Sequence, residues 1–422
     1  MDNNNEAELQ QKEKNGGFWT GFLTASVIFL FIACVALSIS VFIRKAGGSP
    51  EPSATGSVSD DGFVTESRET LDKLNEIEGY IDKSFIDSVS NDTLSEGLYR
   101  GMVEALDDPY ATYYTPEEWV KMQEDTTGVY YGIGAYLTLD EKYMYPRITG
   151  VIPGSGAEAA GIKENDYIME VEGEDIYEQD LESVVARIRG DEGTSVHLTI
   201  ARGEEGARDL LEFDVERHRV ENPTVEWEML EDDIGYIAIA RFEAVTVDQF
   251  AEALAEVKGK GAKGIILDLR SNPGGSLPAA VSIAGMMLPK GTVVYTLDRY
   301  GNRQDFTSSG NNELQIPMVV LVNGNSASAS EILAGAIKDY NKGTLVGTTT
   351  FGKGIVQQIF ELEDESALKI TVSHYYTPNG NDIHGVGIAP DVEVEFDWDE
   401  YEKNETDNQR EKAIEVLKDM MK

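Results

Sequence analysis

The chain has 422 residues, with 35 Lys and Arg against 76 Asp and Glu, and its formal net charge is −41. Domains average roughly 150 residues, so this length predicts two or three of them. An apolar fraction of 41% with 26% charged residues is typical of a folded globular protein. The single cysteine excludes a disulfide framework and a cysteine-rich metal site. The acidic excess argues against a nucleic-acid partner, because phosphate backbones are bound through clusters of Lys and Arg.

The N-terminal part contains a long uncharged stretch, Phe18–Ile43, after a short polar segment at 1–17. A bilayer span needs about 20 apolar residues, so we predict a transmembrane anchor at 18–43. A cleaved signal peptide is the alternative, but its apolar region is usually only about 7–15 residues long. A lipoprotein would use Cys34, yet the residues that follow it stay apolar. The flanking charges do not predict which end of segment 18–43 faces the cytoplasm, because two basic residues lie on each side of it. Acids and bases balance within residues 1–45, so the whole net charge lies after them.

Composition then divides the rest of the chain into five parts. Residues 44–65 are rich in Gly, Ser and Pro and predict a flexible linker. Apolar residues spaced three or four apart predict a helical region at 66–122, in which DDPYATYY forms a turn before a helix that begins at Thr115-Pro116. Short β-like runs punctuated by Gly at 123–215 predict a compact, partly open β-barrel.

The next part, 216–396, alternates buried-type strands with helices near 247–259, 277–288 and 328–340, and the acidic tail at 397–422 ends in a helix from about Asn408. The predicted fold class is therefore α/β, in the sense of a mixed α+β chain.

The most informative local pattern is PMVVLVNGNSASASEI. A continuous apolar strand at Met318–Val322 runs into a turn of small residues and then a helix, with Ser326, Ser328 and Ser330 at the junction. A hydroxyl at this place meets free backbone N–H groups and the helix dipole, which suits nucleophile activation and oxyanion binding. Plain N-capping is the alternative, because Ser is a preferred N-cap residue.

A serine nucleophile needs a base, and the four histidines stand in no recognisable motif. Lys353, flanked by glycines in TTTFGKG, is the other candidate. To act as a base, its pKa must fall from about 10.4 towards 7–8, at a cost of roughly 4 kcal/mol, which burial can supply. The negative chain favours the ammonium form, but salt screens distant charge within about 8–10 Å. Desolvation should therefore prevail if no acid lies close to Lys353.

Two other patterns match known motifs only in part. Gly347–Gly354 resembles a Walker A loop, but Gly354 occupies the position of the Mg²⁺-binding Ser or Thr. Ser366–Lys369 is an S-x-x-K pair, yet SALKITVSHYY alternates like a strand and would not place both residues on one helix face.

Four motifs in order, LDLRSNPGG, NGNSASASEI, TFGKGIVQQ and YYTPNGNDIHGVGIAPD, resemble the carboxyl-terminal processing peptidases, which are serine–lysine proteases with an inserted PDZ domain. The resemblance covers about residues 66–396. It implies a protease core at 216–396 and a PDZ domain at 123–215.

The resemblance also implies site residues. Ser328 would be the nucleophile, Lys353 the general base, and Gln357 the residue that orients the lysine. Oxyanion donors would be the backbone N–H groups of Gly274 or Gly275 and of Ala329. Asp339 has a supporting role in some relatives, but we interpret it as a surface acid at the end of a helix.

In the PDZ region, the Gly132-Ile133-Gly134 run fits the carboxylate-binding loop, and a substrate tail would add a strand beside 135–139. A glycine-rich hairpin turn is the alternative. An arginine of the PDZ helix region couples this domain to the core in relatives, and we choose Arg189, with Arg187 as the rival.

These expectations combine into one function. The protein would be a membrane-anchored serine endopeptidase that captures flexible C-terminal tails of protein substrates and needs no metal or cofactor. Because the family acts outside the cytoplasmic membrane, segment 1–17 would be cytoplasmic and the protease extracytoplasmic. The helical segments 66–122 and 408–422 are candidates for a homodimer contact. A catalytically inert PDZ scaffold is the alternative, and peptide hydrolysis distinguishes the two.

Overall fold

A computed structural model describes residues 67–204 and 207–422. The segment predicted to span a membrane, 18–43, lies outside this range, as do 1–17 and 44–65. Within the described part, every helix is too short or too polar to cross a bilayer. The chain divides into two compact units, Met1–Ser90 and Asn91–Lys422.

Helix α2 (Arg68–Ser84) is the regular element described in the first unit. The side chain of Ser67 caps it by accepting the N–H of Thr70 at 3.3 Å. The three-to-four spacing of apolar residues predicted this helix, but none of its residues is buried in the chain, and Leu71, Ile77 and Tyr80 are exposed. Its apolar side is therefore unpartnered within the described residues.

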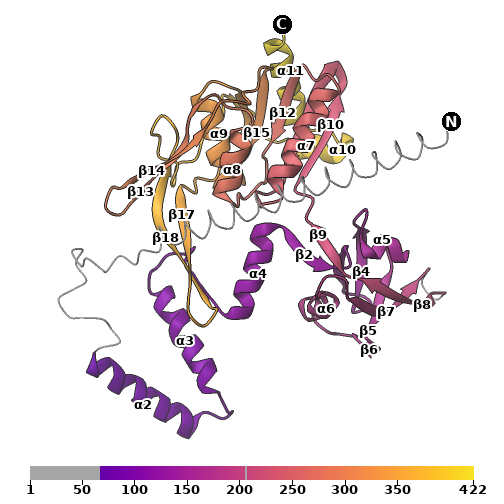
Figure 1. Cartoon of the computed structure of the whole chain (residues 1–422), viewed down its shortest axis with the longest axis vertical. Coiled ribbons are helices and arrows are strands. Elements are labelled where there is room, and N and C mark those ends of the chain that lie inside the picture. The colour runs from indigo at the N-terminus through magenta and orange to yellow at the C-terminus, as the bar shows by residue number, and fades with distance from the viewer. Residues whose placement is uncertain (1–66, 205–206) are drawn as a thin grey trace, which may run out of the picture. The chain divides into compact units, whose positions relative to one another are not determined.

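A six-stranded sheet forms the centre of the second unit (Figure 1). Its order is β10 (Val225–Leu230), β11 (Ile234–Ile239), β12 (Gly264–Asp268), β15 (Met318–Val322), β16 (Thr344–Gly347) and β19 (Val392–Glu393). A 3-10 turn (Glu231–Asp233) joins β10 to β11, and this pair is antiparallel; the other neighbours run parallel. Strands β12 and β15 are buried on both faces, which explains why they read as continuous apolar runs.

Helices cover both faces of this sheet, and each face takes alternate strand residues. Ile265, Leu267 and Val320 face a cluster that contains α7 (Thr246–Gly259), α8 (Leu277–Ala284) and α9 (Ala329–Asp339). Ile266 and Val319 face α11 (Asn408–Met420) on the other side. The predicted strands and these four helices are confirmed. Because the apolar face of α11 is buried in its own core, it is not available for the dimer contact expected of 408–422.

A second, five-stranded sheet is built around the long strand β18 (Ala367–Tyr376). Its members are β1 (Thr112–Tyr114), β13 (Gly291–Asp298), β14 (Arg303–Ser308) and β17 (Ile355–Glu361). β18 is a strand, as its alternation predicted, so Ser366 and Lys369 do not form a helical S-x-x-K pair. β1 was not predicted, because the sequence indicated only a turn there. It pairs with β18 in antiparallel register, Thr112 opposite Lys369.

Residues 129–221, which lie between β1 and β10 in the sequence, form a separate β module with its own core. It contains β3 (Ala135–Asp140), β4 (Tyr145–Val151), β5 (Tyr167–Val171), β6 (Glu174–Asp175), β7 (Ser195–Arg202), β8 (Asp209–Glu216) and helices α5 (Gly156–Ala160) and α6 (Leu181–Ile188). Its core contains fully buried apolar side chains such as Ile148, Ile168 and Leu198. The chain enters through β2 (Val129–Gly132) and leaves through β9 (His218–Glu221), which pair with each other. This agrees with the predicted compact β-barrel.

The remaining helices are α3 (Asn91–Glu104), α4 (Pro116–Thr127) and α10 (Trp398–Asn404). As the Thr115-Pro116 pair predicted, Thr115 caps α4 and Glu118 completes a capping box. Helix α10 was not predicted. Asp397 caps it by accepting the N–H of Glu400 at 3.0 Å.

Candidate active site

Ser328 lies at the sharp turn between strand β15 and helix α9. Its backbone has φ 55° and ψ −112°, a conformation that a residue with a side chain rarely adopts and that costs about 1–3 kcal/mol. Two bonds to the carbonyl of Asn272 hold the turn, from the Ala327 N–H at 3.0 Å and from the Ser330 hydroxyl at 3.0 Å. Strain maintained by surrounding bonds is typical of a functional residue and goes beyond simple N-capping.

The predicted oxyanion residues come together beside Ser328. A Cβ added at Gly274 would lie 2.8 Å from the Cβ of Ser328 and 2.9 Å from the nitrogen of Ala329, so only glycine permits this approach. Gly275 is equally restricted, since a Cβ there would lie 2.0 Å from the carbonyl oxygen of Phe242. The N–H of Gly274 already donates to Asn272 Oδ1 at 2.8 Å. Gly275 is therefore the better placed of the two glycines to supply a donor.

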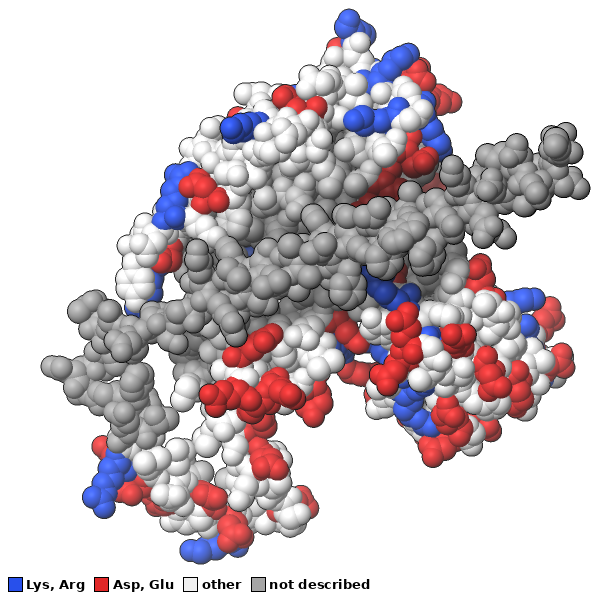
Figure 2. Space-filling model, viewed as in Figure 1, with Lys and Arg blue, Asp and Glu red and all other residues white. Residues whose placement is uncertain are grey.

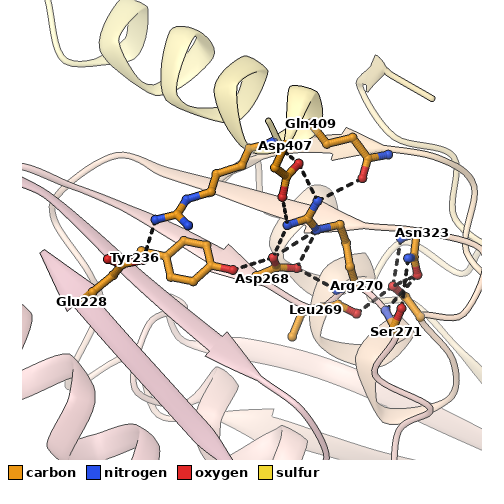
Figure 3. Close-up of polar contacts among 11 residues, drawn as sticks. Glu228, Tyr236, Asp268, Leu269, Arg270, Ser271, Asn323, Asp407 and Gln409 are labelled. Carbon is orange, nitrogen blue, oxygen red and sulfur yellow. Dashed lines mark hydrogen bonds and ion pairs between the residues drawn. The ribbon is translucent and has the colours of Figure 1, made fainter. Parts of the chain in front are cut away.

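A cluster of charged side chains fixes the start of this loop (Figure 3). Arg270 Nη2 binds Asp268 Oδ2 at 2.6 Å and Asp407 Oδ2 at 2.7 Å, and its Nη1 donates to Gln409 Oε1 at 3.1 Å. Asp268 also accepts the hydroxyl of Tyr236 at 2.7 Å. Because the Arg270 side chain is only 14% exposed, these contacts are largely shielded from water. Asp268, the last residue of β12, and Asp407, the N-cap of α11, thus hold Arg270 at the start of the loop.

A second set of bonds joins the same loop to the turn before Ser328. The N–H of Ser271 donates to Asn323 Oδ1 at 2.9 Å, and the hydroxyl of Ser326 donates to the carbonyl of Leu269 at 2.7 Å. Asn323 in turn donates its N–H to Ser326 Oγ at 2.9 Å. Ser326 is completely buried, so its role is to connect the two turns. This explains why a second serine precedes Ser328 in SASAS.

Glu331 joins Ser328 to the loop of Lys353. Its Oε2 accepts the N–H of Ser328 at 2.8 Å and the N–H of Lys353 at 2.8 Å. Its Oε1 accepts the hydroxyl of Thr350 at 2.6 Å and the N–H of Gly352 at 2.7 Å. The residue is 0% exposed, and four donors satisfy its carboxylate. The sequence contained the signal for this contact, since Ser328 and Glu331 fit the S-x-x-E capping box, but we assigned Glu331 no role there.

Tyr375 on β18 forms a second connection between the two residues. Its hydroxyl donates to the carbonyl of Lys353, and the Ser328 side chain lies near enough to act on its pKa in the lowering direction. Burial, and then the negative charge of Glu331, hold the pKa of Tyr375 well above its usual range. The phenol therefore stays protonated and remains a donor.

The side chain of Lys353 lies against the segment that precedes β1. Its Nζ is 4.1 Å from the ring centroid of Tyr110. Burial first, and then the positive charge of Lys369, lower the pKa of Lys353, while Asp108 opposes them. From the sequence, we expected desolvation to prevail if no acid lay close to Lys353. Asp108 does lie close, yet the net direction is still downward, as a general base requires.

Gln357 lies on β17 and donates through Nε2 to Thr371 Oγ1 of β18 at 3.3 Å. Its bond is thus to the neighbouring strand, and its role towards Lys353 stays a prediction. Asp339 is the last residue of α9 and accepts the N–H of Asn379 at 2.8 Å, away from the bonds that join Ser328 to Lys353. This is consistent with a structural acid. The Walker A reading is wrong, because strand β17 follows Lys353 where a P-loop requires a helix.

In the β module, the predicted carboxylate-binding loop connects β2 to β3. Gly134 has φ 76°, and a Cβ there would lie 2.3 Å from that of Ser155, so the loop needs glycine. Arg189 lies next to it: its Cγ is 3.8 Å from the Cβ position of Gly132, and its guanidinium stacks on the Tyr130 ring at 4.9 Å.

The two candidate arginines of this module have different partners. Arg189 pairs with Glu124 of α4, outside the module. Arg187 instead donates to the carbonyl of Val171 at 2.7 Å and pairs with Glu174 at 3.0 Å, both within the module. The geometry therefore favours Arg189 over Arg187 as the coupling residue.

Comparisons with known proteins identify three regions of the chain. The model of peptidase family S41 matches residues 233–394, that of a PDZ domain matches 147–202, and that of the activating protease CtpB N-terminal domain matches 44–118. The carboxyl-terminal-processing protease of Synechocystis sp. is 40% identical over 300 residues, which are 70% of this chain and 69% of that protein. The carboxy-terminal processing protease CtpA of Bacillus subtilis is 36% identical over 370 residues, 87% of this chain and 76% of that protein.

Among solved structures, the photosystem II D1 C-terminal processing protease is similar, with 30% identity, a TM-score of 0.45, and coverage of 76% of this chain and 86% of that one. The S41 match contains Ser328, Lys353 and the oxyanion loop, and the PDZ match contains Arg189. The resemblance stated from the four motifs is confirmed. The chain belongs to peptidase family S41, the carboxyl-terminal processing proteases, and is a serine-type peptidase with a PDZ domain.

Proposed function

We propose that the protein is a membrane-anchored serine endopeptidase that binds substrate C-terminal tails through its PDZ domain and cleaves peptide bonds through an acyl-enzyme on Ser328. One observation carries this proposal: a single buried carboxylate, that of Glu331, binds the backbone of both Ser328 and Lys353. The backbones of the two residues are thereby held at the same carboxylate oxygen. Family membership supports the reaction type, and this geometry supports the residues.

In the proposed reaction, neutral Lys353 removes the proton from the hydroxyl of Ser328. The serine oxygen then attacks a peptide carbonyl, and the N–H groups of Gly275 and Ala329 stabilise the oxyanion. The protonated Lys353 gives its proton to the leaving amine. A water molecule then hydrolyses the ester with the same base, which releases the acid and restores the serine.

Tail recognition would use the edge strand β3, which pairs only with β4 in the sheet order of the described residues. A peptide added beside β3 would end at Gly132–Gly134, where successive N–H groups can bind a carboxylate. The nearby guanidinium of Arg189 supplies positive charge, and its pair with Glu124 gives tail binding a route to α4.

Location and assembly are part of the same proposal. The uncharged stretch Phe18–Ile43 would anchor the protein with its N-terminus in the cytoplasm and its protease outside. The exposed apolar side of α2 supports a homodimer contact in the first unit, since Leu71, Ile77 and Tyr80 have no partner among the described residues that would bury them.

Hydrolysis of a peptide with an unstructured C-terminal tail tests this proposal. Ser328→Ala and Lys353→Ala should each lower kcat/KM by about a thousandfold or more, with an unchanged thermal midpoint. Matched controls are Ser282→Ala and Lys258→Ala, on helices α8 and α7. Activity close to that of the wild type in either site variant would contradict the assigned roles. Tail binding without any hydrolysis by the wild type would instead favour the inert scaffold.

A further inference from the structure

The segment Asp108–Tyr110 lies against the side chain of Lys353, although it belongs to the helical region before the PDZ domain. The Tyr110 ring contacts Lys353 Nζ, with 4.1 Å between the nitrogen and the ring centroid. Asp108 Oδ1 accepts the N–H of Tyr110 at 2.9 Å, so the two residues form one turn. A base that must lose its proton thus lies against a cation-binding ring and near a carboxylate.

Strand pairing fixes this turn in place. β1 follows it directly and pairs with β18, Thr112 opposite Lys369. Lys369 Nζ donates to the hydroxyl of Tyr114 at 2.7 Å, which strengthens the same contact. Thr371, two residues further along β18, accepts the amide of Gln357 at 3.3 Å and helps to lower the pKa of Asp108. Thr371 therefore lies between Gln357 and Asp108.

Charged groups from each neighbouring element act on Lys353. Asp108 comes from the turn before β1, and Lys369 comes from β18; their charges have opposite effects. The other titratable groups contact the backbone of its loop: Glu331 of α9 accepts the Lys353 N–H, Tyr375 of β18 donates to its carbonyl, and His384 lies beside Gly354. Asp108 is thus the carboxylate whose charge acts on the amine itself.

We propose that Asp108 and Tyr110 are positioning residues that hold the ammonium form of Lys353 in place and set the pH at which it becomes the base. This inference rests on the proposed role of Lys353. It also gives Gln357 an indirect role, because its amide orients Thr371 and, through Thr371, the carboxylate of Asp108.

The direction of the effect follows from electrostatics. Burial raises the pKa of Asp108, but bonds from Thr371 and Tyr110 and the charge of Lys353 together hold it below its usual range. Asp108 is therefore ionised at neutral pH, and it favours the protonated amine. Removing its charge should lower the pKa of Lys353, so that the neutral amine becomes available at lower pH.

The experiment is the pH profile of kcat/KM for a tail peptide, whose acid limb reports the base of the free enzyme. Asp108→Asn should move the acid limb to lower pH by on the order of one unit, since a close opposite charge shifts a pKa by about 1–3 units. The matched control is Asp107→Asn, the neighbouring acid, which should leave the profile unchanged. Asp108→Glu should restore most of the wild-type profile.

Variants at two other positions keep the inference falsifiable if Asp108→Asn does not fold. Lys369→Met should move the acid limb in the opposite direction, to higher pH, because a positive charge is removed. Tyr110→Leu should lower kcat by about tenfold through loss of the ring face, and Tyr110→Phe, which keeps the ring, should recover most of that loss. If Asp108→Asn or Lys369→Met lost activity equally at every pH, with an unmoved acid limb, the inference would be overturned. Failure of the proposed base would look different, since Lys353→Ala would then remain active.

Discussion

Glu331 is the residue on which the geometry of the site most depends. Its carboxylate accepts four hydrogen bonds, two of which come from the backbone of Ser328 and Lys353. An amide has only one acceptor oxygen, and its NH₂ group would face donors. The residue does not contact the reacting atoms, so it acts by fixing the positions of those that do.

We therefore predict that Glu331→Gln lowers kcat by about a hundredfold, with little change in KM, and lowers the free energy of unfolding by about 1–3 kcal/mol. Steady-state kinetics and denaturant unfolding would measure the two effects. Thr350→Val removes one of the four donors and also the acceptor of the Ile388 N–H, so it should lower kcat less than Glu331→Gln although it also lowers the stability. An unchanged kcat in Glu331→Gln would show that the contact does not position the catalytic residues.

The sequence could predict those site residues whose positions are fixed by their neighbours in the chain. Ser328 and Ala329 lie at a strand-to-helix turn that apolar runs and small residues indicate. The resemblance, and not the local pattern, pointed to Gly274 and Gly275 in NPGG. Asp108 could not be found in this way, because it reaches Lys353 only after β1 pairs with a strand more than two hundred residues later. A three-residue strand gives no periodicity to detect.

At the scale of elements, the mostly parallel sheet and its covering helices were predictable, whereas of the second sheet only β18 was. Strands β12 and β15 are buried on both faces and read as continuous apolar runs. Strand β14 has the pattern of an exposed hairpin strand, with four of its six residues exposed, so nothing in its composition indicates a strand. The sequence also predicted helix α11 but not its N-terminal contact with the oxyanion loop.

That contact leads to a prediction about the C-terminal helix. Asp407 caps α11 and binds Arg270, which begins the oxyanion loop. Asp407→Asn should lower kcat about threefold to tenfold and lower the free energy of unfolding by about 1–3 kcal/mol, the usual value of a charged hydrogen bond. The matched control on the same helix is Asp419→Asn, which breaks an exposed pair with Lys422 and should change neither measurement.

The pH dependence of stability provides a separate check on Asp407. Burial raises the pKa of Asp407, but Arg270 and the N–H of Arg410 outweigh this effect and hold it below its usual range. A lowered carboxyl pKa contributes stability that is complete above the unfolded value of about 3.9 and is lost as pH falls through the folded value. The unfolding free energy of Asp407→Asn should therefore fall less steeply below pH 4 than that of the wild type. Equal slopes would contradict the assignment.

At the scale of the whole molecule, the net charge of −41 should act on charged substrates and, under the proposed anchoring, on the membrane. All of it lies after residue 45, and Figure 2 shows Asp and Glu side chains gathered over the PDZ domain on the face drawn. If the proposed anchor at 18–43 holds the chain at an anionic membrane, that membrane would repel this part of the chain, and the linker predicted at 44–65 would let it stand away from the surface.

The same field should select among substrate tails by charge. Two peptides with the same cleavage site, one with Lys and one with Glu in the flanking tail, should differ by about tenfold in kcat/KM at low ionic strength, in favour of the basic peptide. Because salt shortens the screening length from about 30 Å at 0.01 M to 3 Å at 1 M, this ratio should fall towards one as salt is added. A ratio that does not change with salt would mean that contacts within the site, and not the field of the acidic chain, cause the preference. A neutral tail of the same length corrects for any direct effect of salt on catalysis.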